Sequence, residues 1–486
     1  MGTGWRKNWK KRLEGVPCPI EKWMKHPTRD AYWRRGSVCE NYDAIRCAVM
    51  AVGGWLDGYT DAIPRLLKHL QVPRMGIIGP HGQQWGHSPR APAPAIGFLQ
   101  EMLRWWDYWL KGIDNGIMKE PMFRAYMQRD VPAAPWYADC PGRWIGETQW
   151  PSPRIKAEKL YLGDTGLSSE PTRDVPRVAV TPQTLGLAGG EWCPYGTGGE
   201  GPEFPGDQRF DDGASICFDG AALRSDLEIL GATKVALDLS VNRPTAFVCV
   251  RLNDVKPDGS STRVAYAVMN LTHRNGHHRT QKLIPGRQYR VIFQLSDAAY
   301  SFIRGHRLRI AISTTYWPMI WPSPEPVELT LHTHNSSIEL PVRPRRGGPK
   351  LTPFLSAEEG PPMSATILSA GASENRVSRD VLSGRVEVLS ERGGDRVLIE
   401  EHGLEVGKRT TVERMSITEG DPLSAETEMT VGNQIKRDGF DVEVKARTHL
   451  TSTEDDFLLT ADLDVYESKS RVLSKRWSVG IPRRGI

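Results

Sequence analysis

Two stretches of the sequence, AVGGWLDGYTDAIPRLL (residues 51–67) and MGIIGPHGQQWGHSP (residues 75–89), decide how the chain folds. Each begins as a short apolar run and ends in a glycine-rich corner that holds polar side chains. The first corner carries Asp57, and the second carries His81 followed by His87. Polar groups that follow buried parallel strands lie at the edge of a sheet where active sites form. We therefore take these three residues as candidates for an active site.

Segments with strand and helix patterns alternate over the first 140 residues. AIRCAVMAVGGW (44–55) and RMGIIGP (74–80) are apolar on both faces, which is typical of buried strands. DAIPRLLKHL (61–70) and GFLQEMLRWWDYWLKGIDNG (97–116) have the apolar spacing of helices. The order strand, helix, strand, helix predicts part of a parallel α/β sheet.

Beyond about residue 140 the pattern changes to alternating strands separated by turns. The clearest of these predicted strands are KVALDLSV (234–241), AFVCVRL (246–252), RVAYAVMNL (263–271), YRVIFQL (289–295) and RLRIAIST (307–314). This spacing favours an all-β sandwich of jelly-roll or related type. A stretch rich in proline and glycine follows (343–362), and further alternating strands come after it, such as FDVEVKARTHL (440–450).

Composition limits the class of protein and its compartment. The chain has 486 residues, enough for two to four domains, and its net charge of +5 does not predict nucleic-acid binding. Its seven cysteines are scattered and form no C-x-x-C pair, which favours a reducing cytoplasm. No apolar run reaches the ~18 residues of a membrane span, and the N-terminus has no secretory signal. We expect a cytoplasmic protein that binds neither nucleic acid nor membrane.

Several segments carry a resemblance to a known family. They are DAYWRRGSVCENYDAIRCAVMAVGGWLDGYTDA (30–62), GFLQEMLRWWDYWLKGIDNG (97–116), DLEILGATKVALDLS (226–240), VRLNDVKPDGSSTRVAYAVMNLTHR (250–274) and GHRLRIAISTTYWPMIWPSPE (305–325). From about residue 25 to 345 the chain resembles the cocaine esterase/X-Pro dipeptidyl-peptidase family of serine hydrolases. The resemblance implies an α/β-hydrolase domain with a helical cap, followed by a jelly-roll domain.

The resemblance also implies a catalytic acid and base. The family's triad aspartate lies in a Gly-Trp-x-Asp-Gly corner, which Asp57 matches without change. Its histidine lies in a Gly-Pro-Trp-x-His corner, where counting without gaps places Gln83. A four-residue insertion would let His87 supply the histidine, and we favour His87 over His81. A further alternative is that neither histidine reaches the site.

The nucleophilic serine has no clear candidate. The family places it on a Gly-x-Ser-x-x-Gly-like elbow before the cap, and triad order puts it ahead of the acid. Ser37, Ser215 and Ser373 lie in partly similar contexts, but none follows a strand and begins a helix. We therefore expect the serine, the oxyanion donors and the central strands to lie outside this sequence. The strand at 44–55 would then have an unpaired edge.

The fold class we expect is multidomain, α/β followed by all-β. The predicted parts are a remnant of the helical cap (1–42), the C-terminal part of an α/β-hydrolase domain without its N-terminal strands and nucleophile elbow (43–140), a jelly-roll β-sandwich (141–345), a linker (346–362) and a C-terminal β-rich region (363–486).

The function we expect is a serine hydrolase that cleaves ester or peptide acyl bonds. The chain would be an N-terminally incomplete form, inactive alone, whose partners are a small ester or peptide substrate and either an N-terminal half-enzyme or a second copy. The alternative is a non-catalytic jelly-roll protein that binds or scaffolds. No cofactor or metal is expected, because His273, His277 and His278 have no cysteine or carboxylate at ligand spacing.

Overall fold

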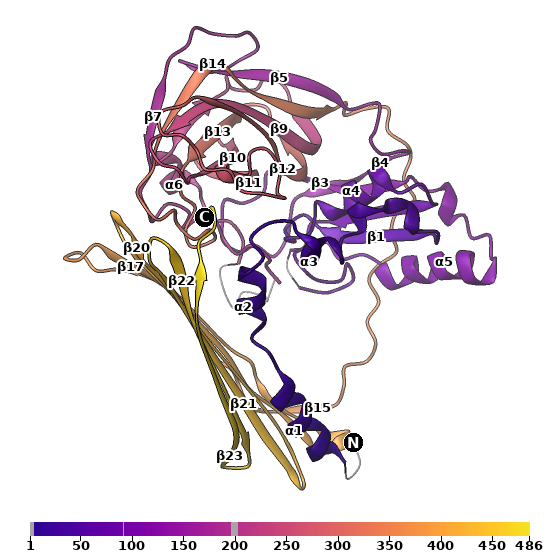
Figure 1. Ribbon diagram of the computed structural model, residues 1–486. Coiled ribbons are helices and arrows are strands. Elements are labelled where there is room, and N and C mark those ends of the chain that lie inside the picture. The colour runs from indigo at the N-terminus through magenta and orange to yellow at the C-terminus, as the bar shows by residue number, and fades with distance from the viewer. Residues whose placement is uncertain (1–3, 91, 196–202) are drawn as a thin grey trace. The chain divides into compact units, whose positions relative to one another are not determined.

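The described residues of the computed structural model form two compact units (Figure 1). The structure describes residues 4–90, 92–195 and 203–486. The central unit holds Gly36–Gly276 and Gln281–Gly360. The N/C unit holds the N-terminal residues to Arg35, His277–Thr280 and Pro361–Ile486. Each unit is described by itself.

The central unit begins with a small parallel sheet covered by helices. Its elements are β1 (Val49–Gly54), α4 (Ala62–His69), β2 (Arg74–Gly79), α5 (Phe98–Lys111), β3 (Phe123–Arg129) and β4 (Gly142–Glu147), with short 3-10 turns at Val38–Glu40, Tyr42–Ala44 and Ile117–Lys119. Strands β1, β2 and β3 are parallel, and β4 runs antiparallel to β3. The predicted strands and helices of this region are confirmed, with ends shifted by a few residues.

The alternation of side chains along β1 and β2 explains why helices cover both faces. Ala51 and Ile78 lie in one apolar cluster with residues of α4. Ile77 of β2 lies in another cluster, with residues of α5. Successive side chains of a strand point to opposite faces, so a strand with apolar residues at every position needs both faces covered. Gly53 lets α4 approach β1, because a Cβ there would collide with Ile63.

Strand β1 stands at one end of its sheet. Among the described residues it pairs only with β2, and the sheet continues from β3 to β12 of the next part of the unit. The unpaired edge predicted for this strand is therefore present in the described structure.

The rest of the central unit is a β-sandwich. Its strands are β5 (Lys156–Gly163), β6 (Gly166–Ser168), β7 (Arg177–Val180), β8 (Ile216–Asp219), β9 (Leu227–Val241), β10 (Phe247–Val255), β11 (Ser261–Asn270), β12 (Tyr289–Phe302), β13 (Arg307–Ser313) and β14 (Glu328–Arg343), with α6 at Arg209–Gly213 and a 3-10 turn at Leu271–His273. One sheet has the order β12-β9-β14-β5-β6, with β7 beside β14, and the other has the order β11-β10-β13-β8. The five alternating segments of the sequence lie on β9 to β13.

The sandwich core lies between these sheets. Leu237 and Leu239 of β9 share one buried cluster with Val248 and Val250 of β10, and all four side chains are excluded from solvent. Burial of one large aliphatic side chain stabilises a fold by roughly 1.5–3 kcal/mol. The predicted arrangement, an α/β part followed by a β-sandwich, is present in the structure.

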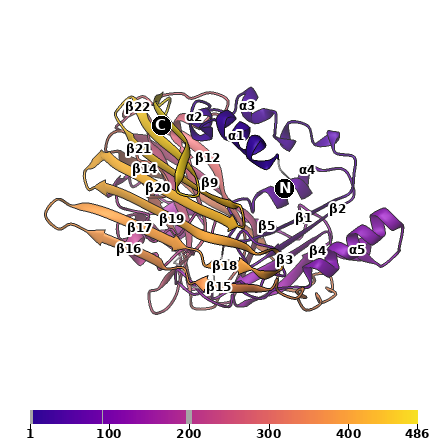
Figure 2. The same ribbon diagram turned by 90° about the horizontal axis from the view of Figure 1, so that it is seen from below.

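The N/C unit is a long antiparallel sheet with short helices. Its strands are β15 (Ala365–Ser369), β16 (Ser373–Arg379), β17 (Arg385–Gly393), β18 (Arg396–Ile399), β19 (Leu404–Thr418), β20 (Asp421–Arg437), β21 (Phe440–Ser452), β22 (Asp456–Glu467) and β23 (Ser470–Pro482), and a 3-10 turn spans Glu400–His402. Figure 2 shows β19 to β22 side by side. Its helices are α1 (Trp5–Gly15), α2 (Pro19–Met24) and α3 (Ala31–Arg34).

The first helix packs on this sheet. The Trp5 ring meets the edge of Phe440 with ring centroids 4.5 Å apart, and Arg6 pairs with Glu467. Lys475 donates from Nζ to the backbone carbonyl of Glu14. Residues from the two ends of the chain thus form one unit. Our assignment of residues 1–42 to the remnant of a cap stays a prediction.

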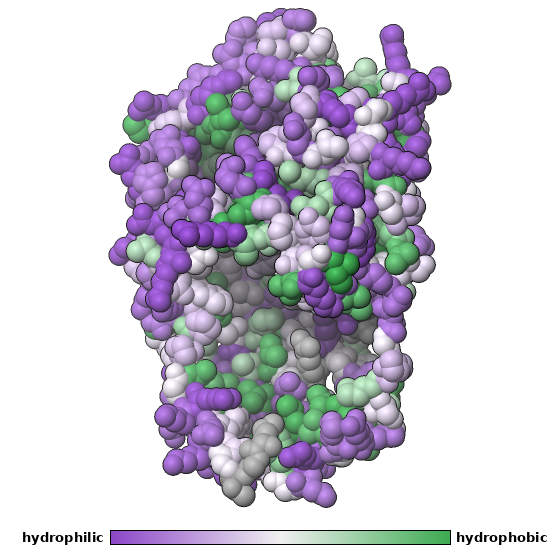
Figure 3. Space-filling model, turned by 90° about the vertical axis from the view of Figure 1, so that its right-hand side faces the viewer, coloured by the Kyte–Doolittle hydropathy of each residue, from purple (hydrophilic) through white to green (hydrophobic). Residues whose placement is uncertain are grey.

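The surface around α5 is mixed in character. Figure 3 shows a mainly hydrophilic face with small separate groups of hydrophobic residues. Helix α5 buries Phe98 and Trp105 and exposes Leu103 and Leu110. None of the helices in the described ranges is both long and apolar enough to span a membrane.

Candidate active site

The ends of β1 and β2 bring the two glycine-rich corners together. The strands are parallel, so their carboxyl ends lie at the same edge of the sheet. The backbone N–H of Trp55 donates to the carbonyl of Gly79 at 3.0 Å, and that of Leu56 donates to the carbonyl of His81 at 3.2 Å. A side chain at Gly54 would collide with the same His81 carbonyl. Glycine at position 54 is therefore what allows the corners to meet.

Asp57 is held firmly at the tip of the first corner. Its Oδ1 accepts a hydrogen bond from the backbone N–H of Tyr59 at 2.9 Å. Thr60 donates from Oγ1 to the carbonyl of Asp57 at 2.9 Å and also to that of Gly54. These bonds fix both the backbone and the carboxylate, so the orientation of Asp57 is set before any ligand binds.

His81 lies buried beneath the corners. Its Nδ1 is 3.0 Å from the carbonyl oxygen of Gly82. Burial lowers the pKa of His81, because it disfavours the charged ring, and the Gly82 carbonyl and the charge of Asp57 only partly offset this effect. The ring is therefore neutral at neutral pH and packs against the end of β2.

His87 lies in a different place. Its ring stacks on Phe98 with centroids 6.0 Å apart, and it lines a surface depression together with Trp85 and Arg90. Its Nδ1 is buried and has no hydrogen-bond partner among the residues that the structure describes. In the described part of the chain no hydrogen bond joins Asp57 to either histidine. The pairing of Asp57 with His87 therefore stays a prediction.

Gln83, rather than either histidine, is connected to Asp57, and the connection runs through the thiol of Cys193. The sequence alone did not single out this cysteine. The Cys193 thiol donates to Gln83 Oε1 at 3.1 Å and lies 3.8 Å from Asp57 Oδ1. The backbone N–H of Gln83 also donates to the carbonyl of Pro194 at 2.8 Å. Burial, and to a lesser extent the charge of Asp57, raise the pKa of the Cys193 thiol. The thiol is therefore protonated at neutral pH and serves as a donor.

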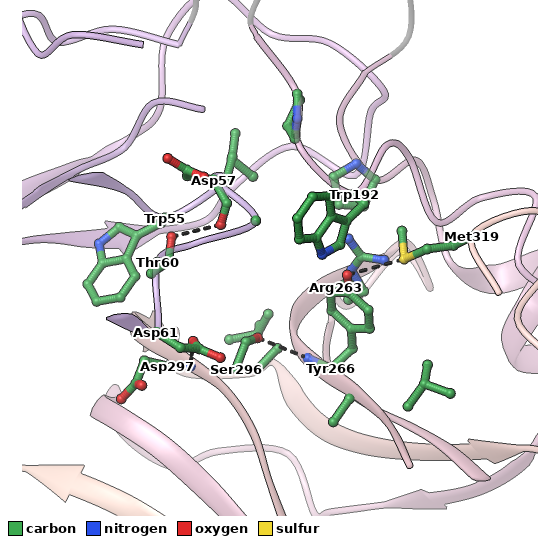
Figure 4. A pocket seen from close by; sticks show the side chains of 18 of the residues that line it. Trp55, Asp57, Thr60, Asp61, Trp192, Arg263, Tyr266, Ser296, Asp297 and Met319 are labelled. Carbon is green, nitrogen blue, oxygen red and sulfur yellow. Dashed lines mark hydrogen bonds between the residues drawn. The ribbon is translucent and has the colours of Figure 1, made fainter. Parts of the chain in front are cut away.

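A pocket of about 530 Å³ opens beside Asp57. Figure 4 shows two walls of this pocket. The residues labelled on the wall nearer β1 are Trp55, Asp57, Thr60, Asp61 and Asp297, and those on the opposite wall are Trp192, Arg263, Tyr266 and Met319. Arg263 and Tyr266 belong to β11, so the sandwich forms part of the pocket. The one serine among the described lining residues is Ser296, whose Oγ accepts from the backbone N–H of Tyr266 at 3.3 Å.

Asp61 and Asp297 are neighbours at the base of the first wall. The backbone N–H of Asp297 donates to Asp61 Oδ1 at 2.8 Å. Burial and then the charge of Asp61 raise the pKa of Asp297 to about 7, against the opposing effect of Arg65 and Lys68. Burial also raises the pKa of Asp61. One proton is therefore retained by this pair over much of the acidic pH range.

Metal-binding groups are not gathered anywhere in the described ranges. No set of three or more histidine, cysteine, aspartate or glutamate side chains there is arranged to hold a metal ion.

Comparison with protein families agrees with the fold. Residues 115–377 match the model for the X-Pro dipeptidyl-peptidase C-terminal non-catalytic domain, and residues 4–89 match the model for X-Pro dipeptidyl-peptidase of the S15 family. The chain belongs to the cocaine esterase/X-Pro dipeptidyl-peptidase family. The resemblance stated from the sequence is thus confirmed.

Individual members of this family are distant relatives. Cocaine esterase of Rhodococcus sp. is 22% identical over 332 residues, which are 62% of this chain and 54% of that protein. The chain spans about half the length of the curated relatives it matches.

Solved structures show the same fold. An aminopeptidase from a marine sediment Thaumarchaeota archaeon has a TM-score of 0.55 at 17% identity, covering 68% of this chain and 61% of that one. An alpha-amino acid ester hydrolase has a TM-score of 0.51 at 20% identity, covering 68% and 61%. The likeness to these structures concerns the fold of this chain.

Proposed function

We propose that this chain forms part of a serine hydrolase that cleaves ester or peptide acyl bonds, with Asp57 as the acid of its triad. The observation that carries the proposal is the position of Asp57. Its carboxylate sits on a rigid corner at the end of a parallel strand and opens onto a pocket shared with the sandwich. Membership of a family of esterases and dipeptidyl-peptidases supports the same chemistry.

In this mechanism the three catalytic groups have separate tasks. A serine hydroxyl attacks the acyl carbon, a histidine takes its proton and later returns it to the leaving group, and the aspartate holds the histidine in the correct tautomer. We propose His87 as the histidine. Its buried Nδ1, which has no partner within the described ranges, is an atom that a carboxylate would satisfy.

We further propose that the serine and the oxyanion donors come from residues that are not in this sequence. The unpaired edge of β1 supports this, because a preceding parallel strand would extend the sheet there and bring its elbow to the same edge. Such residues would belong either to another chain or to a longer form of this one. The chain alone is then expected to be inactive toward small ester or peptide substrates.

The test is hydrolysis of p-nitrophenyl esters and Xaa-Pro-p-nitroanilides by the 486-residue chain, alone and together with an N-terminal segment of a family relative that carries the serine elbow. Turnover is expected only with the added segment, and His87→Ala is expected to abolish it. The matched control is His69→Ala, because His69 is exposed on α4. Turnover by the chain alone would refute the external serine. No turnover in either case would favour the binding or scaffold function.

A further inference from the structure

Arg263 stands out among the groups that line the pocket beside Asp57. Its guanidinium carbon lies 4.1 Å from the ring centroid of Tyr266, and its Nη1 donates to the hydroxyl of Tyr316. Tyr316 is fully buried. The guanidinium is thus held in one orientation by two aromatic side chains, on the wall that Figure 4 shows opposite Asp61 and Asp297.

Arg263 is half-buried, whereas Arg251 and Arg343 of the sandwich are buried and have carboxylate partners. Arg251 lies 3.2 Å from Asp212 Oδ1, and Arg343 lies 2.7 Å from Glu147 Oε1. No ion pair joins Arg263 to a carboxylate within the described residues. A guanidinium has five N–H donors and remains charged in proteins. Among the described residues the Tyr316 hydroxyl is the one acceptor bonded to this guanidinium, so N–H donors of Arg263 remain for a ligand in the pocket that it lines.

The carboxyl-bearing residues that line the pocket are Asp57, Asp61, Glu191 and Asp297, and none of them forms an ion pair with Arg263 in the described structure. Among the described lining residues it is the only lysine, arginine or histidine. Asp57 accepts from a backbone N–H at its own corner, and Asp61 accepts from the backbone N–H of Asp297. Arg65 and Lys68 line an adjoining depression together with Asp61 and Asp297. Their positive charges lower the pKa of Asp297. Asp61 and Asp297 therefore have Arg65 and Lys68 as neighbouring cations.

We propose that Arg263 binds the carboxylate of a ligand in this pocket, so that the site accepts molecules with an anionic, planar oxygen group at one end. A guanidinium fork matches a carboxylate with two parallel hydrogen bonds. The aromatic rings of Trp192 and Tyr266 on the same wall suit an apolar body next to that carboxylate. Applied to the proposed function, on which this extension rests, the substrates would be esters or amides that also carry a free carboxylate.

The inference is tested by binding alone, with no need for turnover. Benzoate and benzamide are nearly the same shape and differ in charge, so their dissociation constants for the 486-residue chain are compared by calorimetry or ligand-observed NMR. The native chain is expected to bind benzoate about tenfold more tightly than benzamide, the size of one charge-assisted hydrogen-bonded pair. Arg263→Met is expected to remove this preference and leave benzamide binding unchanged.

Two further variants make the test decisive. Arg307→Met is the matched control, because Arg307 is exposed on β13 and is not among the lining residues. Arg263→Lys keeps the charge without the planar fork and is expected to retain only part of the preference, so it decides the matter if Arg263→Met does not fold. Equal affinity of the native chain for the two probes would overturn the proposal. So would an unchanged preference in the position-263 variants. Neither result bears on whether the family's hydrolysis takes place.

Discussion

Replacing Asp297 by asparagine is expected to change how the stability of the chain depends on pH. The pKa of this carboxyl is raised from 3.8 to about 7 in the folded chain. Between those values the folded state holds a proton that the unfolded state has released, so the stability that the group contributes falls as pH rises through this range. From pH 5 to pH 8 this loss is roughly 2–3 kcal/mol for a shift of this size. The asparagine side chain of Asp297→Asn cannot ionise, so it contributes no such pH-dependent loss of stability.

Urea unfolding of both proteins at pH 5 and pH 8 measures this difference. The free energy of unfolding of Asp297→Asn, relative to the native chain, is expected to rise by roughly 2–3 kcal/mol between the two pH values. The exposed Asp164→Asn variant serves as the control and is expected to show no such rise. A difference between Asp297→Asn and the native chain that stays constant with pH would refute the reasoning about the Asp61–Asp297 pair.

Three further changes have defined outcomes. Glu101→Gln leaves the buried guanidinium of Arg124, now 2.7 Å from Glu101, without its anion, and should lower the free energy of unfolding by roughly 3–5 kcal/mol in urea titration; a loss below about 1 kcal/mol would contradict this account. Gly54→Ala places a Cβ against the carbonyl that closes the two corners, so the melting temperature should fall clearly, and an unchanged value would show that the corners have room. Gln83→His puts an imidazole in place of the amide that the Cys193 thiol connects to Asp57. The negative charge of Asp57 should raise the pKa of this imidazole above the ordinary 6.5, which NMR titration measures. An unshifted value would mean that position 83 does not face Asp57.

The spacing of apolar residues was sufficient to predict the strands and helices around Asp57 and the strands of the sandwich core. The apolar runs that became β1 and β2 have apolar clusters on both faces, and the glycines around Asp57 are needed where two strand ends meet. Both features depend on residues that are close together in the sequence, so they can be recognised from it. The same holds for α5 and for the strands of the sandwich core, whose periodicity is set by one buried face.

The pocket could not be predicted in this way. Trp192, Arg263 and Asp297 carry no motif, and they reach Asp57 only because β3 pairs with β12 and thereby joins the α/β sheet to the sandwich. Pairing between strands far apart in the sequence leaves no periodic signal in either of them. The packing of Trp5 on Phe440 was missed for the same reason.

The measurement that tests the central claim most directly is the specificity constant of the chain, supplied with the serine-bearing segment, for a p-nitrophenyl ester before and after Asp57→Asn. The account predicts a fall of roughly 10³–10⁴-fold, because asparagine would hold the histidine in the wrong tautomer, and no comparable fall for the exposed Asp114→Asn control. Equal rates for native chain and Asp57→Asn would contradict the assignment of Asp57 as the acid of a hydrolase triad.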